Sequence, residues 1–551
     1  MLFSLLFYAY WYTQVIFDVR RVSKPNHSFL GGYKMSTQVK SDKIRMFVFL
    51  PAFILLVVTI ILNFATPETF LTVTEAAKDF MTIQSGWMFS LAGVACLIIV
   101  LLAYFSPLGE VRVGGPNAKP LLDRKSWFAV TLTTTIASGI IFWGTAEPIW
   151  HLAYPPQGIE PMSAEAAKFA METLFLHWTF VPYAFYTVPT IVFAFAYYNM
   201  KKNFSVGSEI SPILGKMDQK KIDRWVDAII LFAIGTGIAS SFATSVMNMG
   251  GGINALTGIN NDKTVWIIVA IVTTILFTAA SGSGLFKGIK VLAKFNVYLY
   301  YLIIGVLVIL GPTVYMFSLG TEAFGGFLSG LFDKALFTGA AANDSWATGW
   351  TTFYWTNWMA WAPVTAVFLA RISYGYKIKE IITMNFFIPA GFGAVWMTVL
   401  GGTAINFQMT GKVDLLTIMN EQGSGAAGYA ILSQFPLSGL LIVIYLIAVI
   451  VSFATATDST TNAMASICTT GITEAEQEAP LYLKVLWGAI IGTMAVIFLA
   501  TFGGEGIKML SYLGGFPALI LGILSLISLV VIMKRPQKYD VVSKQQKEEN
   551  E

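Results

Sequence analysis

A dense group of aromatic residues lies between residues 350 and 376 of the chain. Its first twelve positions hold four tryptophans, a tyrosine and a phenylalanine in an otherwise apolar stretch. On a helix, Trp350, Tyr354, Trp358 and Trp361 would share one face, and Trp355 would lie off it. The face of an aromatic ring carries partial negative charge, and a desolvated organic cation held over it gains about 2 kcal/mol per ring. The spacing therefore favours a site for an organic cation.

A second interpretation of this stretch stays open from the sequence alone. Tryptophan and tyrosine also gather where membrane helices meet the lipid headgroups. Such a belt needs only one or two aromatic residues at each helix end, which is fewer than this stretch carries. Both interpretations place the stretch in a helix that enters a membrane.

The composition is that of a polytopic membrane protein. Of the 551 residues, 56% are hydrophobic and only 12% are charged, and the mean hydropathy is +0.66. A soluble domain carries about twice that share of charged residues. The sequence contains no Walker-type phosphate loop and no nucleophile elbow, which argues against ATP-driven transport and against an enzyme. No nucleic-acid partner is expected.

Twelve spans of roughly 20 apolar residues can be counted along the chain. They centre on residues 46–64, 87–105, 127–147, 178–198, 226–249, 265–281, 296–318, 350–370, 384–404, 428–455, 483–503 and 511–533. Lysine and arginine concentrate in every second connection between these spans. Because cytoplasmic loops are the ones enriched in these residues, the pattern predicts a multi-pass plasma-membrane protein with both termini in the cytoplasm.

Three of the predicted spans are too polar or too interrupted for plain lipid-facing helices. They are Thr131–Trp150, His177–Pro189 and Ser452–Asn462. In the first, Ser138 and Gly139 favour local unwinding, and Glu147–Pro148 is expected to end the helix. The third carries Asp458 in a run of hydroxyl groups. Secondary transporters hold substrate and ions on such broken helices, although close helix packing through small residues is the alternative.

The histidines give no indication of a metal centre. His27, His151 and His177 are far apart in the sequence, and acidic residues do not cluster near them. The prediction is therefore that the protein has no metal site and no organic cofactor.

Five motifs resemble those of the betaine/carnitine/choline transporter (BCCT) family. They are the tryptophan-rich stretch at 350–373, GTAEP at 144–148, HWTFVPYAFY at 177–186, NMGGGIN at 248–254 and ATATDS at 454–459. The resemblance implies an all-α polytopic membrane protein with twelve transmembrane helices in a LeuT-like five-plus-five inverted repeat, residues 127–318 and 350–533. It also implies a homotrimer in the lipid bilayer that imports small quaternary ammonium solutes.

Domain boundaries follow from this resemblance. Residues 46–533 would form the transporter domain, between a cytoplasmic N-terminal segment, 1–45, and a cytoplasmic C-terminal tail, 534–551. Residues 1–34 hold a short aromatic-rich apolar run followed by basic residues, without a leader-like cleavage site. Met35 is therefore expected to be the native start, and residues 1–34 are expected not to be native.

The resemblance also assigns roles to aromatic residues. It places four rings in an aromatic box around a trimethylammonium group, namely Trp178, Tyr183, Tyr186 and Trp358. Tyr183 stands where the family usually has tryptophan, and its ring still offers a face to a cation. Trp361 would hold substrate in passage. The route to the box would be lined by Trp350, Tyr354 and Trp355.

The choice of substrate depends on the third predicted span. Backbone N–H groups near Ser138 and Gly139 would meet a substrate carboxylate. Choline-specific relatives tend to carry an acid at the position of Gly139, which is uncharged here. Glycine betaine is therefore the first candidate. A choline or carnitine carrier or exchanger stays open, and a non-transporting membrane sensor is a distant alternative.

The coupling ion is the least determined feature. Sodium prefers hard oxygen ligands, and Ile234, Ile238 and Val364 stand at positions of one family sodium site. The other site would draw on four residues, Thr135, Ile136, Thr455 and Ala456, of which Ala456 replaces a serine. Asp458 and Glu147 are the candidate proton carriers. Sodium, a proton or exchange without a coupling ion all remain open.

Overall fold

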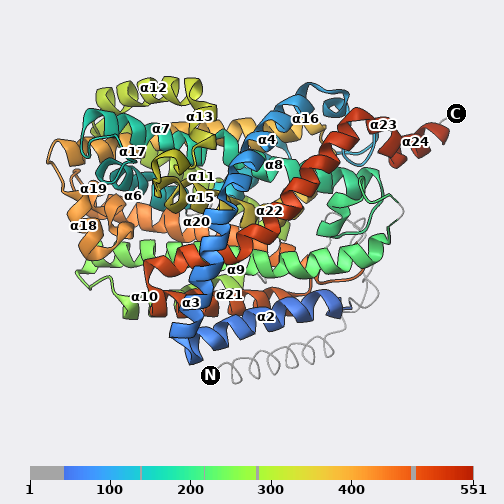
Figure 1. The fold of residues 1–551 in the computed structure, drawn as a ribbon, viewed down its shortest axis with the longest axis horizontal. Helices are drawn as coiled ribbons and strands as arrows, with labels where there is room; N and C mark the ends of the chain where they lie inside the picture. Colours follow the sequence, from blue (N-terminus) through green and yellow to red (C-terminus); the bar gives the residue numbers. More distant parts are fainter. Residues whose placement is uncertain (1–42, 137–138, 216, 281–284, 473–478, 550–551) are drawn as a thin grey trace, which may run out of the picture.

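The chain folds into a bundle of helices, drawn as a ribbon in Figure 1. The computed structural model describes residues 43–136, 139–215, 217–280, 285–472 and 479–549. Within these ranges, β-type pairing is confined to two isolated bridges, Ile44 with Thr469 and Arg112 with Lys377. The expected all-α class is confirmed. The predicted N-terminal run with Met35, and Ser138, lie outside the described residues.

Long apolar helices are connected by short helices and turns. The first half holds α2 (Met46–Ala65), α3 (Pro67–Asp79), α4 (Gly86–Phe105), α5 (Arg124–Ile136), α6 (Gly139–Ala153), α7 (Ala164–Trp178), α8 (Phe180–Ala194), α9 (Gln219–Thr257), α10 (Lys263–Ala280) and α11 (Leu285–Leu310). The second half holds α12 (Thr313–Ser329), α13 (Leu331–Leu336), α14 (Trp346–Gly349), α15 (Thr351–Ile372), α16 (Ile378–Ile382), α17 (Ile388–Met409), α18 (Leu415–Gln422), α19 (Ala427–Leu432), α20 (Ser438–Ile467), α21 (Leu481–Phe502), α22 (Gly504–Lys534), α23 (Pro536–Tyr539) and α24 (Val541–Glu548). Short π-helical turns are Phe80–Gln84, Phe195–Asn199 and Thr383–Phe387, and 3-10 turns are Pro107–Glu110, Val206–Ile210, Ala340–Ala342 and Ser424–Ala426.

Most of the predicted spans coincide with long apolar helices. In the described part of the chain, nine helices are long and apolar enough to cross a membrane, and α5 with α6 would make a tenth. The two other predicted spans coincide with α10, of 18 residues, and α15, of 22 residues. A helix satisfies its own backbone hydrogen bonds, as the bilayer core requires. The count of twelve stays a prediction, because α10 and α15 do not pass on apolar length alone.

Helix α15 carries the tryptophan-rich stretch and runs through the interior of the bundle. Every residue of α15 except Asn357 is buried. It packs against α8, α9, α20 and α22, and its label stands between those of α11 and α20 in Figure 1. Trp355, Trp358 and Trp361 are at most 6% exposed. A belt at the lipid headgroups is therefore the wrong interpretation for these three residues, which belong to the protein core.

The third predicted span is bent at the expected place. The described residues of α5 end at Ile136 and those of α6 begin at Gly139, and the axes of the two helices differ by 48°. The expectation that Glu147–Pro148 ends the helix is wrong, because Pro148 lies inside α6, which continues to Ala153. A membrane helix tolerates proline where neighbouring helices pack around the freed carbonyl. Helices α7 and α17 pack against α6 in this way.

The fourth and tenth predicted spans behave differently from each other. Thr179 separates α7 from α8 with a non-helical backbone, φ −123° and ψ −118°. The tenth span is unbroken, because α20 runs through the hydroxyl-rich segment as one helix of 30 residues. The hydroxyls of Thr455, Ser459 and Thr460 donate to carbonyls of the preceding turn, so the side chains are satisfied without unwinding the helix.

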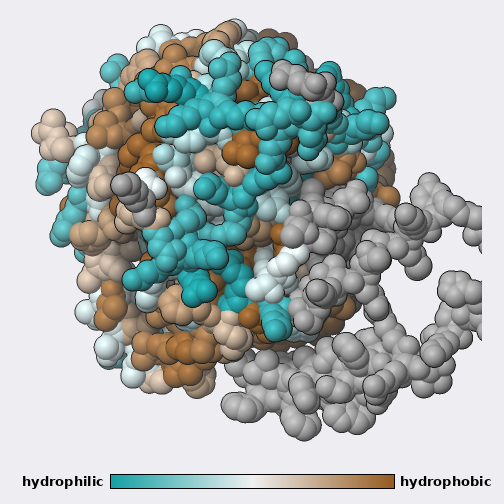
Figure 2. Space-filling model, turned by 90° about the vertical axis from the view of Figure 1, so that its right-hand side faces the viewer, coloured by the Kyte–Doolittle hydropathy of each residue, from teal (hydrophilic) through white to brown (hydrophobic). Residues whose placement is uncertain are grey.

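The outer surface of the bundle separates apolar sides from a polar end. Helix α2 lies beside α9 and α21 along one side, and it exposes large apolar side chains such as Leu55 and Ile61. Figure 2 looks onto the right-hand end of Figure 1, and hydrophilic residues cover much of that face. Helices α16, α23 and α24 lie at this end. This arrangement agrees with lipid around the sides and water at the end.

Arg45, the residue before α2, connects three segments at the polar end. Its guanidinium Nη1 lies 2.6 Å from Asp227 Oδ2 on α9 and donates to the Ile467 carbonyl of α20 at 2.8 Å. Asp227 is fully buried, and its other oxygen accepts from Ser205 Oγ at 2.9 Å and from the Val206 N–H at 2.8 Å. Arg45 thus balances a carboxylate that water does not reach.

Arg45→Ala is expected to destabilise the fold, because it leaves the Asp227 carboxylate buried without its cation. Removing one partner of a buried ion pair costs about 3–5 kcal/mol. Thermal unfolding of the detergent-solubilised protein, followed by size-exclusion chromatography, should show a lower Tm. Arg224→Ala, which removes an exposed arginine near the same end of α9, is the matched control. Equal Tm values for the two variants would contradict this role of Arg45.

Candidate functional site

Four aromatic rings meet where α7, α8 and α15 come together. The ring centroid of Trp358 lies 5.6 Å from that of Trp178, 5.6 Å from that of Tyr183 and 5.0 Å from that of Tyr186. All four side chains are at most 4% exposed. The structure therefore brings together the four residues of the predicted aromatic box, with Trp358 at its centre.

The break between α7 and α8 positions these rings. Trp178 is the last residue of α7, and α8 starts again at Phe180, so Tyr183 and Tyr186 share one face of a new helix, three residues apart. The Trp178 carbonyl at the break is approached closely by α17. A Cβ atom on Gly393 would lie only 2.4 Å from this carbonyl oxygen, so only glycine allows the approach.

Two hydrogen-bond donors in the box have no protein acceptor. The hydroxyl of Tyr183 and the indole Nε1 of Trp358 are both buried without a partner among the described residues. A buried donor without a partner costs about 1–3 kcal/mol. Both atoms are therefore available to a ligand that accepts hydrogen bonds.

Gly139 lies beside the box at the start of α6. A Cβ atom built on Gly139 would lie 3.4 Å from Cη2 of Trp178, which is ordinary van der Waals contact. Its predicted proximity to the substrate site is thus compatible with the fold.

The other aromatic residues of the stretch point in several directions. The ring centroid of Tyr354 lies 5.5 Å from that of Trp178. The ring of Trp355 instead packs against Phe185, with 5.5 Å between the ring centroids, away from the box face. The indole of Trp361 turns to α9, where it donates to the Gly237 carbonyl at 3.1 Å and to Ser241 Oγ at 3.0 Å. Trp361 therefore joins α15 to α9, and its predicted role in passage stays a prediction.

Trp350 is half-buried at the start of α15, where it contacts Trp143, a residue to which the sequence assigned no role. The ring centroid of Trp143 on α6 lies 6.1 Å from that of Trp350 and 5.9 Å from that of Tyr354. Trp143 thus extends the aromatic surface next to the box. It precedes the GTAEP motif directly, which is the signal that could have identified it.

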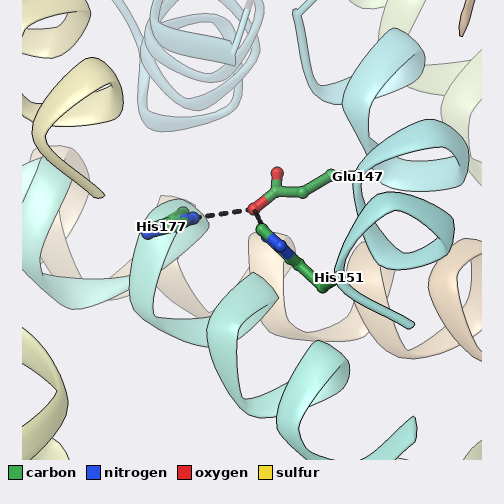
Figure 3. Close-up of side chains that lie close together, drawn as sticks. All are labelled: Glu147, His151 and His177. Carbon is green, nitrogen blue, oxygen red and sulfur yellow. Dashed lines mark hydrogen bonds and ion pairs between the residues drawn. The ribbon is translucent and has the colours of Figure 1, made fainter. Parts of the chain in front are cut away.

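Glu147 of α6 is the centre of a buried hydrogen-bond network beside the box. Its Oε1 is 3.1 Å from His151 Nε2 and 2.7 Å from His177 Nδ1. Its Oε2 accepts from the Trp178 indole Nε1 at 2.7 Å and, in a short hydrogen bond, from the Tyr354 hydroxyl. Figure 3 shows the two histidines approaching the carboxylate from different sides. The carboxylate therefore fixes the orientation of a box ring.

The expectation that acidic residues and histidines lie apart is wrong at this position. Glu147, His151 and His177 are all 0% exposed and lie in contact. His151 follows Glu147 by four residues, which places both on one face of α6. That spacing was visible in the sequence. The approach of His177, thirty residues away, depends on how α7 packs against α6.

Three donor atoms of this cluster have the spacing of metal ligands. Glu147 Oε1, His151 Nε2 and His177 Nδ1 lie within 4.8 Å of one another. A separation of 2.7 Å between Oε1 and Nδ1 is that of an N–H···O hydrogen bond. With the Trp178 and Tyr354 donors on Oε2, the carboxylate is already saturated. Hydrogen bonds therefore account for the arrangement, and we assign the cluster to a hydrogen-bonded network.

The predicted ion-coupling residues lie where α5 meets α20. Thr134 Oγ1 and Ser459 Oγ are 3.4 Å apart across this contact, and both residues are buried. Thr135 and Thr455 direct their hydroxyls to carbonyls of their own helices. Ile136 is the last described residue of α5. The contact thus offers side-chain hydroxyl oxygens, including two, of Thr134 and Ser459, that were not predicted.

The remaining candidate residues for ion coupling supply few oxygen ligands. Ala456 is buried and has no side-chain donor atom, and Asp458 is half-buried on α20. Ile234, Ile238 and Val364 are at most 2% exposed. Their aliphatic side chains supply no ligand for an ion.

Comparison with known proteins gives a consistent result. The family model described as "BCCT, betaine/carnitine/choline family transporter" matches residues 47–538. The glycine betaine transporter OpuD of Bacillus subtilis (strain 168) is 28% identical over 487 residues, which cover 88% of this chain and 91% of OpuD. The ectoine/hydroxyectoine transporter of Virgibacillus pantothenticus is 26% identical over 480 residues, covering 87% of this chain and 94% of that protein.

Solved structures show only a remote likeness. The substrate-bound outward-open state of a Na+-coupled sialic acid symporter gives a TM-score of 0.43 at 13% sequence identity, covering 81% of this chain and 95% of that chain. The family match, by contrast, spans nearly the whole chain and includes the aromatic cluster and the Glu147 network. The chain therefore belongs to the betaine/carnitine/choline (BCCT) family of transporters.

Proposed function

We propose that this transporter imports a quaternary ammonium compatible solute, with glycine betaine as the first candidate, by alternating access around the aromatic box. The observation that carries the proposal is the meeting of Trp178, Tyr183 and Tyr186 with Trp358 in a buried cluster. A trimethylammonium group has no N–H to donate, so aromatic faces are its natural host. Each desolvated ring contributes about 2 kcal/mol.

The cation head alone does not account for micromolar binding, which requires about 8 kcal/mol after the costs of ordering and desolvation. A carboxylate on the cargo would add hydrogen bonds from the Tyr183 hydroxyl and the Trp358 indole, which find no acceptor among the residues that the structure describes. Choline has no carboxylate to offer these donors. The uncharged Gly139 beside Trp178 likewise provides no counterpart for the choline hydroxyl. These features favour a zwitterion.

Coupling to an ion is part of the proposal. The oxygens between α5 and α20, around Thr134 and Ser459, support a single sodium site. A proton remains the alternative, and the uptake experiment below separates the two. We also expect a homotrimer in the plasma membrane with both termini in the cytoplasm. Helices α23 and α24 lie at the polar end in Figure 1, which agrees with a C-terminal segment in water.

Uptake into proteoliposomes tests the proposed function as a whole. Radiolabelled glycine betaine, carnitine and choline should be offered separately, each under an inward sodium gradient, an inward proton gradient and no gradient. Glycine betaine should accumulate most, and the sodium gradient should drive it. Accumulation of choline alone would refute the zwitterion preference. If none of the three solutes accumulates under any gradient, the proposed function is wrong.

Trp358→Leu should weaken binding of glycine betaine at least about tenfold, because one ring face at the centre of the box is lost. Quenching of intrinsic fluorescence or calorimetry on the purified protein measures this affinity. Trp358→Tyr should restore part of it. Trp225→Leu, which removes an exposed tryptophan of α9, should bind normally. Unchanged affinity in folded Trp358→Leu protein would exclude this ring from the site.

Gly139→Asp should shift the preference from glycine betaine towards choline, because a carboxylate beside Trp178 attracts the cation and hydroxyl of choline and repels the carboxylate of betaine. The contact distance of 3.4 Å at Gly139 leaves room for the new Cβ. The ratio of the two dissociation constants should change about tenfold or more. Gly139→Asn controls for side-chain size. Equal effects of Asp and Asn would contradict an electrostatic origin.

A further inference from the structure

The protonation state of the Glu147 network follows from its hydrogen bonds. Four groups surround the carboxylate: two imidazole nitrogens, the Trp178 indole and the Tyr354 hydroxyl. The indole can only donate, and an ionised carboxylate can only accept. Four donors on one carboxylate stabilise its charged form. Glu147 therefore carries a full negative charge at 0% exposure.

The same hydrogen bonds place a ring N–H of each histidine on the carboxylate. His151 donates from Nε2 and His177 donates from Nδ1, because both nitrogens face Glu147 Oε1 and an ionised carboxylate can only accept. The second nitrogen of His177 shares a hydrogen bond of 3.1 Å with Thr351 Oγ1. The second nitrogen of His151, Nδ1, is buried and has no partner among the described residues. It is a vacant basic atom next to a buried negative charge.

The charged groups around the network leave this charge unbalanced. On α7, Glu172 pairs with Lys334, Lys168 pairs with Glu322, and Glu165 is exposed. Helix α17 has no titratable residue, and α19 has only Tyr429. Helix α18 has Glu421, which is exposed. The titratable residues of α9 all lie among its first nine residues, at the far end of that helix. The titratable residue that α15 contributes to the network is Tyr354, whose hydroxyl donates to Glu147 Oε2. The Nζ atom of Lys508 on α22 lies 5.7 Å from the ring centroid of Trp350. The rings of Trp350 and His151 are in turn 4.5 Å apart between centroids.

Lys508 is thus separated from the carboxylate by a ring and an imidazole, and no lysine or arginine makes direct contact with Glu147 in the described part of the chain. A buried charge without a counter-ion is costly, so the network favours a cation nearby. Two cations can supply it. One is the cationic head of a cargo in the box, whose ring Trp178 is hydrogen-bonded to Glu147. The other is a proton on His151 Nδ1.

We propose that Glu147, His151 and His177 form an anionic counter-charge for the cationic head of the cargo, and that His151 Nδ1 binds a proton in competition with that cargo. A hydronium ion transfers its proton to the lone pair of Nδ1, its O–H bond breaks and leaves a water molecule, and the network gains one positive charge. None of its hydrogen bonds needs to change. This inference rests on the proposed function for the identity of the cargo.

The competition predicts a direction for the effect of pH. Acidification places the proton on His151, adds a positive charge to the network and weakens the binding of a cation. The effect should be larger for tetramethylammonium, which is only a cation, than for glycine betaine, whose carboxylate is repelled by the same charge. A role of the network in packing alone would change both affinities together.

Calorimetric titration of the full-length protein in nanodiscs tests this competition. Between about pH 8.5 and about pH 5, either side of the usual histidine pKa, tetramethylammonium affinity should fall at least about tenfold. Titrations in two buffers of different ionisation enthalpy should show that binding releases protons. His151→Gln retains an N–H for Glu147 but cannot be protonated, so its affinity should not depend on pH. Glu147→Gln should bind weakly at every pH, whereas Glu165→Gln, an exposed carboxylate on α7, should behave as wild type. A pH-independent wild-type affinity, or a wild-type slope in His151→Gln, would overturn the proposal.

A second measurement needs no cargo and so separates this proposal from the proposed function. The chain has 3 histidines, so selective isotope labelling gives few imidazole resonances. One resonance should titrate between about pH 5 and about pH 8.5, and His151→Gln should remove it. If no quaternary ammonium binds but this resonance titrates, the proposed function fails and the proton site stands. If the resonance of His151 does not titrate, the proton site is refuted whatever the cargo.

Discussion

The burial of one carboxylate organises the region around the aromatic box. Glu147 sits on α6, and its hydrogen-bond donors come from α6, from α7 and from α15. In a low-dielectric interior an ionised carboxylate is tolerated only if its oxygens are satisfied. The three helices must therefore hold a common register, because a shift of any of them would leave the charge with missing donors. The constraint extends directly to Trp178, a ring of the box.

Helix breaks supply the geometry that continuous helices would not. Consecutive residues on a helix point about 100° apart, yet His177 and Trp178 reach the two oxygens of the same carboxylate. Trp178 is the last residue of α7, and the non-helical backbone of Thr179 follows it directly before α8 begins at Phe180. Tyr183 and Tyr186 then face Trp358 from the new helix. Gly393 allows α17 to cover the carbonyl exposed at the break.

The interior of α15 shows how stability and binding are divided along one helix. Trp361 satisfies its indole N–H on α9 and fastens the helix in the core. Trp358, three residues earlier, keeps its indole N–H buried and without a partner in the described part of the chain. A core selected for stability alone would satisfy or remove such a donor. Local departures from this rule are expected at functional sites, and here the departure falls on the ring at the centre of the box.

The sequence alone determined the membrane class and the all-α fold, and its resemblance to the family named the four aromatic residues that the structure brings together, because apolar length and local motifs carry this information. Trp178, Tyr183 and Tyr186 fall in one short motif, and Trp358 stands out on a helix rich in tryptophan. The sequence also located the break near Gly139. Its prediction of a broken tenth span was wrong, since hydroxyl groups that suggest unwinding can bond to their own helix instead.

Only the tertiary structure decided which polar groups meet. His177 reaches Glu147 from thirty residues away, Tyr354 from more than two hundred, and Thr134 meets Ser459 across two helices. No local pattern encodes these contacts, because they depend on the packing angles of α6, α7 and α15 and of α5 against α20. The tryptophan stretch shows the same limit. Its spacing allowed both a lipid belt and a cation site, and the burial of α15 among its neighbours selected the interior, where an aromatic face is free of competing water.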